Sequence, residues 1–570
     1  MRHELGYIAS VIAIAAFTLA VHSGCNSSQQ TPETAQQSDP MPIPQSVEHS
    51  SSDGAFVRDQ TVVTQAGAEG PVQGNVTSPQ SELRPVSSPA ELQPPPTTSD
   101  SSAEQDSAKP KLPRRELFEG WEKPVAALFL TGQQHGYIEP CGCTGLTNQK
   151  GGLMRRQTFL DQLKNDRGWD VVALDVGNQV RRFGRQAEIK FQTTAEGLKK
   201  MDYQAISFGP DDLRLSVDEV FAAVASEDPD DIKYISSNAS LLGFTPKHRI
   251  VEAGGKKIGI TGVLGAKEQQ RISNAEVEMG DPMQELAASW NALKAEDCDL
   301  YVLLAHASLD ESREFAKAFP GFQIVVTAGG AGEPTLKPEI IEGSNNQMIQ
   351  VGTKGMYVGV VGIYDDADNP FRYERVALDA RFADSEEMLR VMASYQKQLE
   401  TLGLDGLGIR PQPHSSGFSY VGSETCADCH SEAYEVWENS KHSHATETLV
   451  HPPERYEVPR HFDPECLACH VTGWNPSLYM PFQSGYLSLD KTPEMKSVGC
   501  ENCHGPGSHH VASQMGEGDF TEEQTASFVE KMRLPLERAR ETCLQCHDLD
   551  NSPDFHAKGA FEEYWEKIKH

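Results

Sequence analysis

Residues 116–383 alternate between two hydrophobic patterns. Short apolar runs, typical of buried strands, are separated by amphipathic stretches whose apolar positions recur with helical spacing. The runs that we interpret as strands are Val125–Leu130, Val171–Leu174, Ala205–Phe208, Val302–Leu304 and Ile324–Val326. The stretches that we interpret as helices are Gly152–Leu163, Ala187–Lys200, Pro282–Leu293 and Glu311–Phe319. Strands that alternate with helices indicate a layered α/β domain.

Three further apolar runs follow without helices between them. They are Met348–Val351, Tyr357–Ile363 and Phe371–Leu378, and they predict strands that close the sheet. An amphipathic helix is then predicted from Ser385 to about Leu402. Its apolar face consists of Met388, Leu389, Met392, Tyr395 and Leu399. Gly, Pro and Ser gather at residues 403–417, so we expect the domain boundary there.

The first 25 residues have the pattern of an export signal. The uncharged run Leu5–Val21 follows the basic Arg2 and precedes small residues. The run is too short for a membrane span. Ser23-Gly24-Cys25 resembles a bacterial lipobox, although His22 stands where an aliphatic residue is usual. A lipid on Cys25 would hold the protein at a membrane surface; the alternative is a cleaved signal with a spare cysteine.

Residues 26–115 have a low-complexity composition rich in Pro, Ser and Gln, with Phe56 as the single aromatic residue. Such a segment cannot bury enough apolar surface to offset the entropy of ordering it. We therefore expect a disordered tether. The whole chain has 82 acidic against 50 basic side chains and a net charge of -32. That balance argues against nucleic acid or anionic lipid as the main partner.

Eight of the twelve cysteines form four Cys-x-x-Cys pairs, each followed directly by histidine. The motifs are Cys426-Ala-Asp-Cys429-His430, Cys466-Leu-Ala-Cys469-His470, Cys500-Glu-Asn-Cys503-His504 and Cys543-Leu-Gln-Cys546-His547. On a helical turn, two cysteines at this spacing can form thioethers with one haem, and the histidine ligates the iron. Structural zinc or disulfides would not require a histidine after every pair. The sequence thus predicts four covalent haems, whose attachment also supports export.

The second axial ligands must come from elsewhere in the same region. Nine other histidines are available: His414, His442, His444, His451, His461, His509, His510, His556 and His570. Only four methionines compete with them, so His/His ligation is favoured. Haems without Met ligation have lower potentials.

Residues 418–570 resemble the cytochrome c-554 family of tetrahaem proteins. The similarity lies in Tyr420–His430, Asp463–Gly473, Val498–Ser508 and the closing Tyr564-Trp565 and Ile568-Lys-His570. The resemblance implies a compact, mainly helical domain with closely stacked haems. It also implies that His442 and His510 are distal ligands, with His444 and His509 as rivals, and that His570 and His461 are weaker candidates. In that family one haem can keep an open position.

Residues 124–366 resemble the 5′-nucleotidase branch of the calcineurin-like metallophosphatases. The similarity lies in Phe129–Pro140, Gly151–Arg156, Leu174–Asn178, Gly209–Asp212, Leu304–His306 and Thr327–Pro334. That family binds two divalent metals to activate water. Of its ligand positions only His135 and His306 remain. The others are occupied by Gln133, Asn178, Pro210-Asp211 and Gly329–Gly332. We therefore expect a retained scaffold without the two metals, although Asp211 and Asp212 could hold one cation weakly.

Relative to that family, this chain has an additional motif, Cys141-Gly142-Cys143, on the loop after the first strand. A close cysteine pair in an exported protein can be a reversible dithiol/disulfide couple. The arrangement resembles a UshA-like (seleno)protein group in which the equivalent cysteine can be selenocysteine. A structural disulfide and two inert thiols are the alternatives. Cys298, beside an apolar strand, is expected to be a small buried hydrophobic residue.

These patterns predict a multidomain fold in which an α/β metallophosphatase-like layered sandwich precedes a mainly α-helical multihaem cytochrome c domain. The predicted segments are 1–25 (signal), 26–115 (linker), 116–383 (α/β domain), 384–417 (helical linker) and 418–570 (tetrahaem domain). We expect an electron-transfer cytochrome with a redox site at Cys141 and Cys143. The alternatives are chemistry of nitrogen or sulfur compounds at an open haem and, last, metal-dependent phosphoester hydrolysis. A periplasmic or membrane redox partner and a lipid anchor in the cell envelope complete the expectation.

Overall fold

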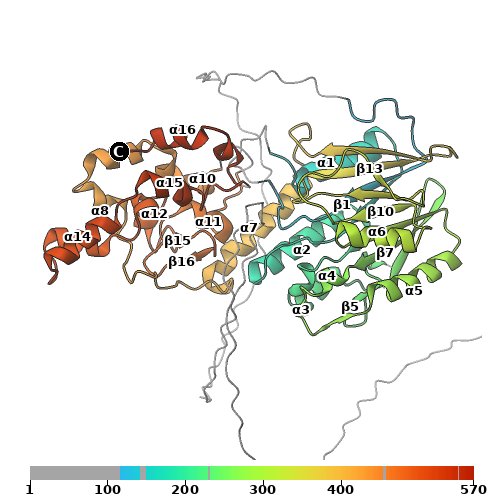
Figure 1. Cartoon of the computed structure of the whole chain (residues 1–570), viewed down its shortest axis with the longest axis horizontal. Helices are drawn as coiled ribbons and strands as arrows, with labels where there is room; N and C mark the ends of the chain where they lie inside the picture. Colours follow the sequence, from blue (N-terminus) through green and yellow to red (C-terminus); the bar gives the residue numbers. More distant parts are fainter. Residues whose placement is uncertain (1–115, 141–148, 229–230, 453–456, 550) are drawn as a thin grey trace, which may run out of the picture. The chain divides into compact units, whose positions relative to one another are not determined.

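The computed structural model describes residues 116–140, 149–228, 231–452, 457–549 and 551–570 (Figure 1). The predicted signal, Cys25 and the tether lie outside the described residues. The described residues belong to one compact unit, Ser107–His570. None of its described helices is both long and apolar enough to cross a membrane.

The first of two six-stranded sheets has the order β14-β13-β1-β2-β3-β4. Its strands are β1 (Ala126–Thr131), β2 (Val171–Asp175), β3 (Tyr203–Ser207), β4 (Tyr234–Ile235), β13 (Tyr357–Ile363) and β14 (Phe371–Ala377). β1 to β4 are parallel, with Leu128 beside Val172, whereas β13 returns antiparallel to β1. Two of the three predicted closing strands, β13 and β14, therefore extend this sheet beyond β1, whereas the one predicted at Met348–Val351 lies in the second sheet as β12 (Gln347–Gln350).

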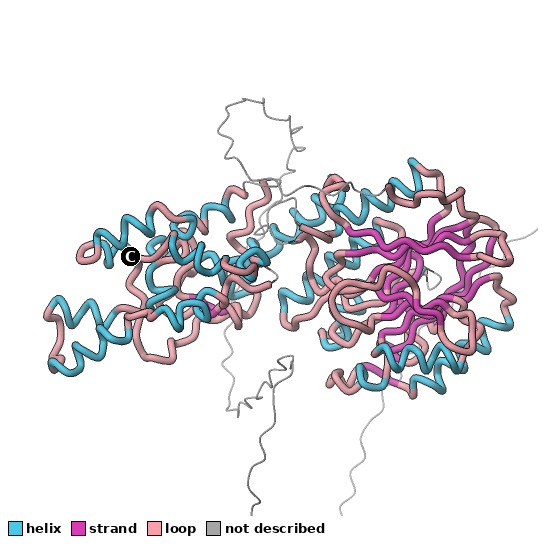
Figure 2. Tube along the Cα trace, turned by 45° about the horizontal axis from the view of Figure 1, so that its top comes forward, coloured by secondary structure: helices cyan, strands magenta, loops and turns pink. Residues whose placement is uncertain are grey.

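The second sheet has the order β11-β12-β10-β9-β7-β6. Its strands are β6 (His248–Ala253), β7 (Lys256–Leu264), β9 (Leu300–His306), β10 (Ile324–Thr327), β11 (Glu339–Ile340) and β12 (Gln347–Gln350). A separate pair consists of β5 (Ala239–Leu241) and β8 (Val277–Met279). Figure 2 shows the strands of the two large sheets gathered between helices.

Alternating side chains of the strands build two separate cores. Leu128 and Leu130 of β1 share an inter-sheet core with Ile260 of β7. Phe129 points to the other face, where it joins a core formed with α1 (Leu153–Asp161), α2 (Arg185–Lys200) and α7 (Glu386–Gly406). The second sheet is covered by α5 (Pro282–Ala295) and α6 (Leu309–Ala318). The result is a four-layer α/β/β/α sandwich, which confirms the predicted fold class.

Helix α7 is the helix expected from Ser385. Ser385 caps it by accepting a hydrogen bond from the backbone N–H of Met388. The helix buries Met388, Met392, Tyr395 and Leu399 against the core with α1 and α2, and bends at Gly403. It is therefore part of the α/β packing as well as a connection to the next region.

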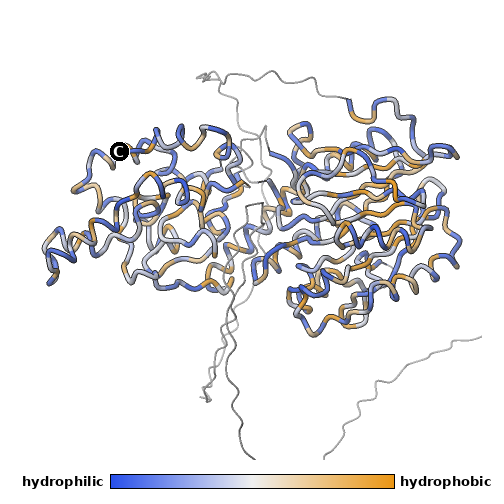
Figure 3. The backbone as a smooth tube through the Cα atoms, viewed as in Figure 1, coloured by the Kyte–Doolittle hydropathy of each residue, from blue (hydrophilic) through white to orange (hydrophobic). Residues whose placement is uncertain are grey.

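The region after α7 consists of short helices. They are α8 (Ser423–Ala427), α9 (Ser431–Glu438), α10 (Glu447–Val450), α11 (Pro464–His470), α12 (Cys500–His504), α13 (Ser508–Met515), α14 (Glu522–Lys531), α15 (Leu536–Cys543) and α16 (Ala560–Glu566). In the same region, β15 (Trp474–Asn475) and β16 (Met480–Pro481) form a small hairpin. Two further short helices, α3 (Val217–Val224) and α4 (Ala266–Gln269), belong to the sandwich. In Figure 3 the hydrophobic positions concentrate along the strands of the sheets. The cluster around Leu467, Trp474 and Tyr486 is much smaller than the sandwich cores.

Candidate functional site

Each Cys-x-x-Cys-His motif is a helical turn. α11 carries Cys466, Cys469 and His470, and α12 carries the third motif. In the first and fourth motifs the backbone N–H of the histidine donates to the carbonyl of the first cysteine, at 2.9 Å in both. The two cysteines and the histidine thus lie at positions i, i+3 and i+4 of one turn. This arrangement fits two thioethers and one axial ligand to the same haem.

Three histidine pairs join a motif to a histidine outside the motifs. The ring centroids of His430 and His510 are 6.3 Å apart, those of His442 and His547 6.1 Å, and those of His504 and His570 5.7 Å. A metal–imidazole bond is about 2 Å long, and a ring nitrogen lies about 1 Å from its ring centre. Two imidazoles on opposite faces of one iron therefore have centroids about 6 Å apart. The three pairs have the separation that bis-histidine haems need.

Oxygen partners orient the motif histidines. The Nδ1 of His504 donates to the Met532 carbonyl at 2.7 Å, and that of His470 donates to the Ala445 carbonyl at 2.8 Å. His547 Nδ1 is 2.9 Å from the Ser552 hydroxyl. Burial lowers the pKa of His470 and His504, and that of His547 to about 4. Neutral rings whose Nδ1 is engaged keep Nε2 available for a metal.

His470 differs from the other three motif histidines. Among the described residues no histidine ring pairs with it. His444, the rival of His442, is exposed and faces the Glu447 carboxylate at 3.8 Å. His509, the rival of His510, stacks on Phe418 with centroids 4.1 Å apart, and His461 packs against Phe462. The structure thus places His442, His510 and His570 opposite motif histidines, and places their rivals elsewhere.

Glu501, inside the third motif, connects that motif to the first. Its carboxylate is 2% exposed and accepts N–H bonds from Val421 at 3.0 Å and from Gly422 and Gly507 at 2.8 Å. Burial raises its pKa, although these backbone donors oppose the shift. Ser423 contributes a further bond, because its hydroxyl accepts the backbone N–H of Cys500. Sequence reasoning missed this residue, whose signal is an acidic side chain between two haem-binding cysteines.

The α/β domain places two histidines at the carboxyl ends of its strands. His306 ends β9, is 3% exposed, and donates from Nδ1 to the Val176 carbonyl at 2.7 Å. His135 follows β1, and its buried Nδ1 has no hydrogen-bond partner among the described residues. Gln133, His135 and Asn178 all have positive φ, of 49°, 55° and 60°. Strained backbone of this kind gathers at functional sites.

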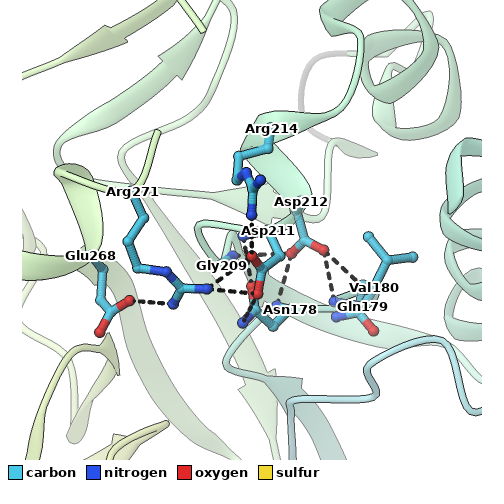
Figure 4. Close-up of polar contacts among 9 residues, drawn as sticks. All are labelled: Asn178, Gln179, Val180, Gly209, Asp211, Asp212, Arg214, Glu268 and Arg271. Atoms are coloured by element: carbon cyan, nitrogen blue, oxygen red, sulfur yellow. Dashed lines mark hydrogen bonds and ion pairs between the residues drawn. The ribbon is translucent and has the colours of Figure 1, made fainter. Parts of the chain in front are cut away.

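Side chains of the α/β domain neutralise Asp211 and Glu268 (Figure 4). Arg271 donates from Nη2 to both carboxylate oxygens of Asp211, at 2.8 and 2.9 Å, and from Nη1 to Glu268 at 2.6 Å. Asn178 Nδ2 adds a bond to Asp211 at 3.2 Å. The guanidinium group thus takes the position that a cation would need beside this carboxylate.

The Asp212 carboxylate is bound by backbone N–H groups instead of by side chains. It is fully buried and accepts backbone N–H bonds from Gln179 at 2.7 Å, Asn178 at 2.8 Å and Gly209 at 3.0 Å. Burial raises its pKa to about 7, against the effect of these donors. Gln133 donates its amide to two carbonyls, of Ala328 and Gly352. The residues present do not fit two divalent cations, which require several free oxygen or nitrogen ligands.

Cys141 and Cys143 lie outside the described residues. Glu139, just before them, forms an ion pair with Arg460, with Nε–Oε1 at 2.6 Å and Nη2–Oε2 at 3.0 Å. Arg460 lies ahead of α11 in the haem-motif region. The segment that leads into the Cys-Gly-Cys loop is therefore tied to the region that carries the second motif. Cys298 is buried, as expected.

Comparison with known proteins identifies the C-terminal region. Residues 425–505 match the family model described as cytochrome c554 and c-prime. This region is cytochrome c554-like. Cytochrome c-554 of Nitrosomonas europaea is 24% identical over 166 residues, which cover 26% of this chain and 66% of that protein. A cytochrome c554 domain implies covalently bound haem c.

The N-terminal half resembles 5′-nucleotidases and apyrases. The apyrase of Aedes albopictus is 22% identical over 306 residues, which cover 47% of this chain and 53% of that protein. A 5′-nucleotidase precursor from Thermus thermophilus superposes with a TM-score of 0.41 at 18% identity, covering 49% of this chain and 59% of the other. The chain thus spans about half the length of the apyrase. The two parts of the chain thus resemble different known proteins, apyrases in the N-terminal half and cytochrome c-554 in the C-terminal region.

Proposed function

We propose that this protein is an exported tetrahaem c-type cytochrome that acts in electron transfer. The observation that carries the proposal is the set of three histidine pairs at iron-spanning separation. Each pair unites a Cys-x-x-Cys-His motif with a histidine distant in sequence. Neither a zinc site nor a disulfide framework would require such pairs.

Each motif would hold one haem through its two cysteines and its histidine. His510, His442 and His570 would be the distal ligands of the first, fourth and third motifs. Such haems are one-electron carriers, and bis-histidine ligation gives them low potentials. Glu501 and Ser423 hold the first and third motifs together, which favours exchange of electrons between neighbouring haems.

The α/β domain would supply a two-electron site at Cys141 and Cys143. Oxidation of the two thiols to a disulfide releases two electrons and two protons, and one-electron carriers accept such electrons singly. The bond between Glu139 and Arg460 supports this assignment, because it ties the entry of the loop to the haem-motif region. A periplasmic or membrane redox partner would take the electrons onward, and a lipid on Cys25 would keep the protein at the cell envelope.

A second candidate is a haem enzyme that acts on a nitrogen or sulfur compound. His470 favours it, because this motif histidine has no ring opposite it among the described residues. A haem held there would retain a position for a ligand. Metal-dependent phosphoester hydrolysis ranks last, because Arg271 and backbone N–H groups occupy the carboxylates of the former metal site.

The test is intact-mass measurement followed by anaerobic redox titration. Protein matured with a haem-attachment system should carry four haem additions. Thiol trapping at set potentials should then show one reversible couple that disappears in Cys141→Ser and Cys143→Ser. Fewer than four additions would remove one haem site from the proposal. The rate of haem reduction by each electron donor should also be measured in both variants. If all these rates equal those of the wild type, the cysteine pair is structural and the haem enzyme becomes the better interpretation.

A further inference from the structure

The helix that carries the second haem motif starts in a cluster of charged and polar side chains. Glu465 directly precedes Cys466, and its carboxylate is 2.7 Å from Lys190 Nζ and 3.2 Å from Arg182 Nη1. Lys190 belongs to α2, and Arg182 to the segment before it, both in the α/β domain. Their side chains are 11% and 45% exposed, and that of Glu465 is 29% exposed. We call Arg182, Gln186, Lys190, Asp463 and Glu465 the α2–α11 cluster.

Asp463 anchors the same helix. It is 4% exposed and caps α11 by accepting the backbone N–H of Glu465 at 2.9 Å. It also accepts hydrogen bonds from Gln186 at 2.7 Å, Gln396 at 3.1 Å and the Tyr395 hydroxyl at 3.3 Å. These three donors come from α2 and α7. The first turn of α11 is thus held by side chains of the α/β domain.

The cluster extends to the other side of the motif. The Arg182 guanidinium lies 3.6 Å from the ring centroid of Tyr479 and hydrogen-bonds its hydroxyl. Tyr479 is close enough to Cys469 for the two groups to interact electrostatically, as Tyr395 and Arg460 are to Cys466. Arg182 of the α/β domain therefore contacts a residue beside Cys469, as well as Glu465 beside Cys466.

We propose that the α2–α11 cluster tunes and positions the haem at Cys466, Cys469 and His470. This inference rests on the proposed function, because it requires a haem at the second motif. Oxidised haem carries one more positive charge than reduced haem. A negative charge at Glu465 therefore lowers the potential, whereas Lys190 and Arg182 raise it. Partly buried charges are screened less than fully exposed ones, so Lys190 and Glu465 should act on a nearby group more strongly than Arg182 does.

The test is spectroelectrochemical titration of the full-length holoprotein. Glu465→Gln should raise one of the midpoint potentials, and Lys190→Met should lower that same one. Lys190→Arg, which keeps the charge, should restore a value near that of the wild type. His470→Met shows which midpoint potential belongs to the haem at the second motif, because a changed ligand on that iron shifts only the potential of that haem. Lys200→Gln is the matched control, since Lys200 lies on the same helix and pairs only at 3.6–3.8 Å with Glu387 and Glu196.

If Glu465→Gln and Lys190→Met shift the midpoint potential of the same haem in opposite directions, the effect is electrostatic tuning and not a loss of structure. Equal potentials in all variants, shifts of the same sign, or shifts in another haem would overturn the inference. If Glu465→Gln fails to acquire its haems, Arg182→Gln replaces it, because this side chain is 45% exposed and tolerates exchange. It should lower the same potential. Absence of haem at the second motif in wild-type protein would instead contradict the proposed function.

Discussion

The imidazole rings of His430 and His510 lie 6.3 Å apart, centroid to centroid, and are inclined by only 27°. His430 ends the first motif, just before α9, and His510 lies on α13. Near-parallel rings at this separation leave space for one haem plane between them. The neighbouring His509 instead stacks on Phe418. Adjacent histidines of the same helix thus have different surroundings, which makes them a matched pair for experiment.

His510→Met should raise the potential of one haem, because a thioether ligand favours the reduced iron. Axial ligands span about 0.8 V, so a shift of tenths of a volt is expected. Redox titration of the holoprotein measures it. His509→Met should leave all the potentials unchanged. A response to His509→Met in place of His510→Met would reassign the ligand.

His570→Ala should convert one six-coordinate haem into a five-coordinate, high-spin haem. His570 faces His504 at 5.7 Å, and no other histidine ring is paired with His504 among the described residues. Electron paramagnetic resonance of the oxidised protein reports the change. His444→Ala is the control, because its exposed ring faces the Glu447 carboxylate at 3.8 Å and no histidine ring is paired with it among the described residues. Unchanged low-spin signals in His570→Ala would exclude this residue as a ligand.

Glu501→Gln should destabilise the haem domain by about 1–3 kcal/mol, the usual cost of leaving a buried donor unsatisfied. An amide NH₂ would then face backbone N–H groups of Val421, Gly422 or Gly507. Chemical denaturation of the holoprotein, followed by circular dichroism, gives the free energy of unfolding. The exposed Glu494 provides a control, since its exchange for Gln should change stability by less than about 0.5 kcal/mol.

Manganese or zinc should not induce phosphate release from nucleotides by this protein. Arg271 neutralises Asp211, and backbone N–H groups satisfy Asp212. Neither carboxylate is therefore free to bind a divalent metal ion. A colorimetric phosphate assay and elemental analysis check the two parts of this expectation. Tight binding of two divalent metals together with metal-dependent hydrolysis would contradict it.

Local sequence patterns predict most of the sandwich, and the failures have physical causes. Strands such as Tyr357–Ile363 are continuous apolar runs, and the structure confirms them. β7 is not among the predicted strands, although it lies inside the second sheet, between β9 and the edge strand β6. It begins with Lys256-Lys257 and contains Gly259 and Gly262. A Cβ at Gly262 would lie 2.7 Å from the Ser207 hydroxyl, so close packing of the sheets requires a residue without a side chain there.

The haem motifs are local, whereas their surroundings are not. A Cys-x-x-Cys-His turn can be recognised from five residues, so the sequence predicts where haems attach. The choice between His509 and His510 depends on which ring faces His430, and that is a tertiary relationship. The same holds for Glu465, whose partners Lys190 and Arg182 lie far away in the chain. Neither spacing nor composition contains that information.

His135 and His306 should make the α/β domain lose stability in mild acid. Burial lowers the pKa of His306, and burial with the nearby Arg181 lowers that of His135 to about 3. The unfolded chain takes up protons near pH 6.5, whereas the folded domain keeps these rings neutral. Between about pH 6.5 and pH 3 the unfolded state therefore binds more protons, and stability falls as the pH is lowered. For His135 the expected loss from pH 7 to pH 5 is about 2 kcal/mol, and His306 changes the stability in the same direction.

Urea unfolding of wild-type protein and of His135→Gln, each at pH 7 and pH 5, isolates this effect. Carboxylates titrate in both proteins and cancel in the comparison. The variant should therefore lose about 2 kcal/mol less than the wild type on acidification. The Nδ1 of His135 is buried without a partner among the described residues, whereas His306 donates to Val176, so His135 can be replaced at smaller structural cost. Equal losses in the two proteins would mean that the His135 ring is protonated in the folded state.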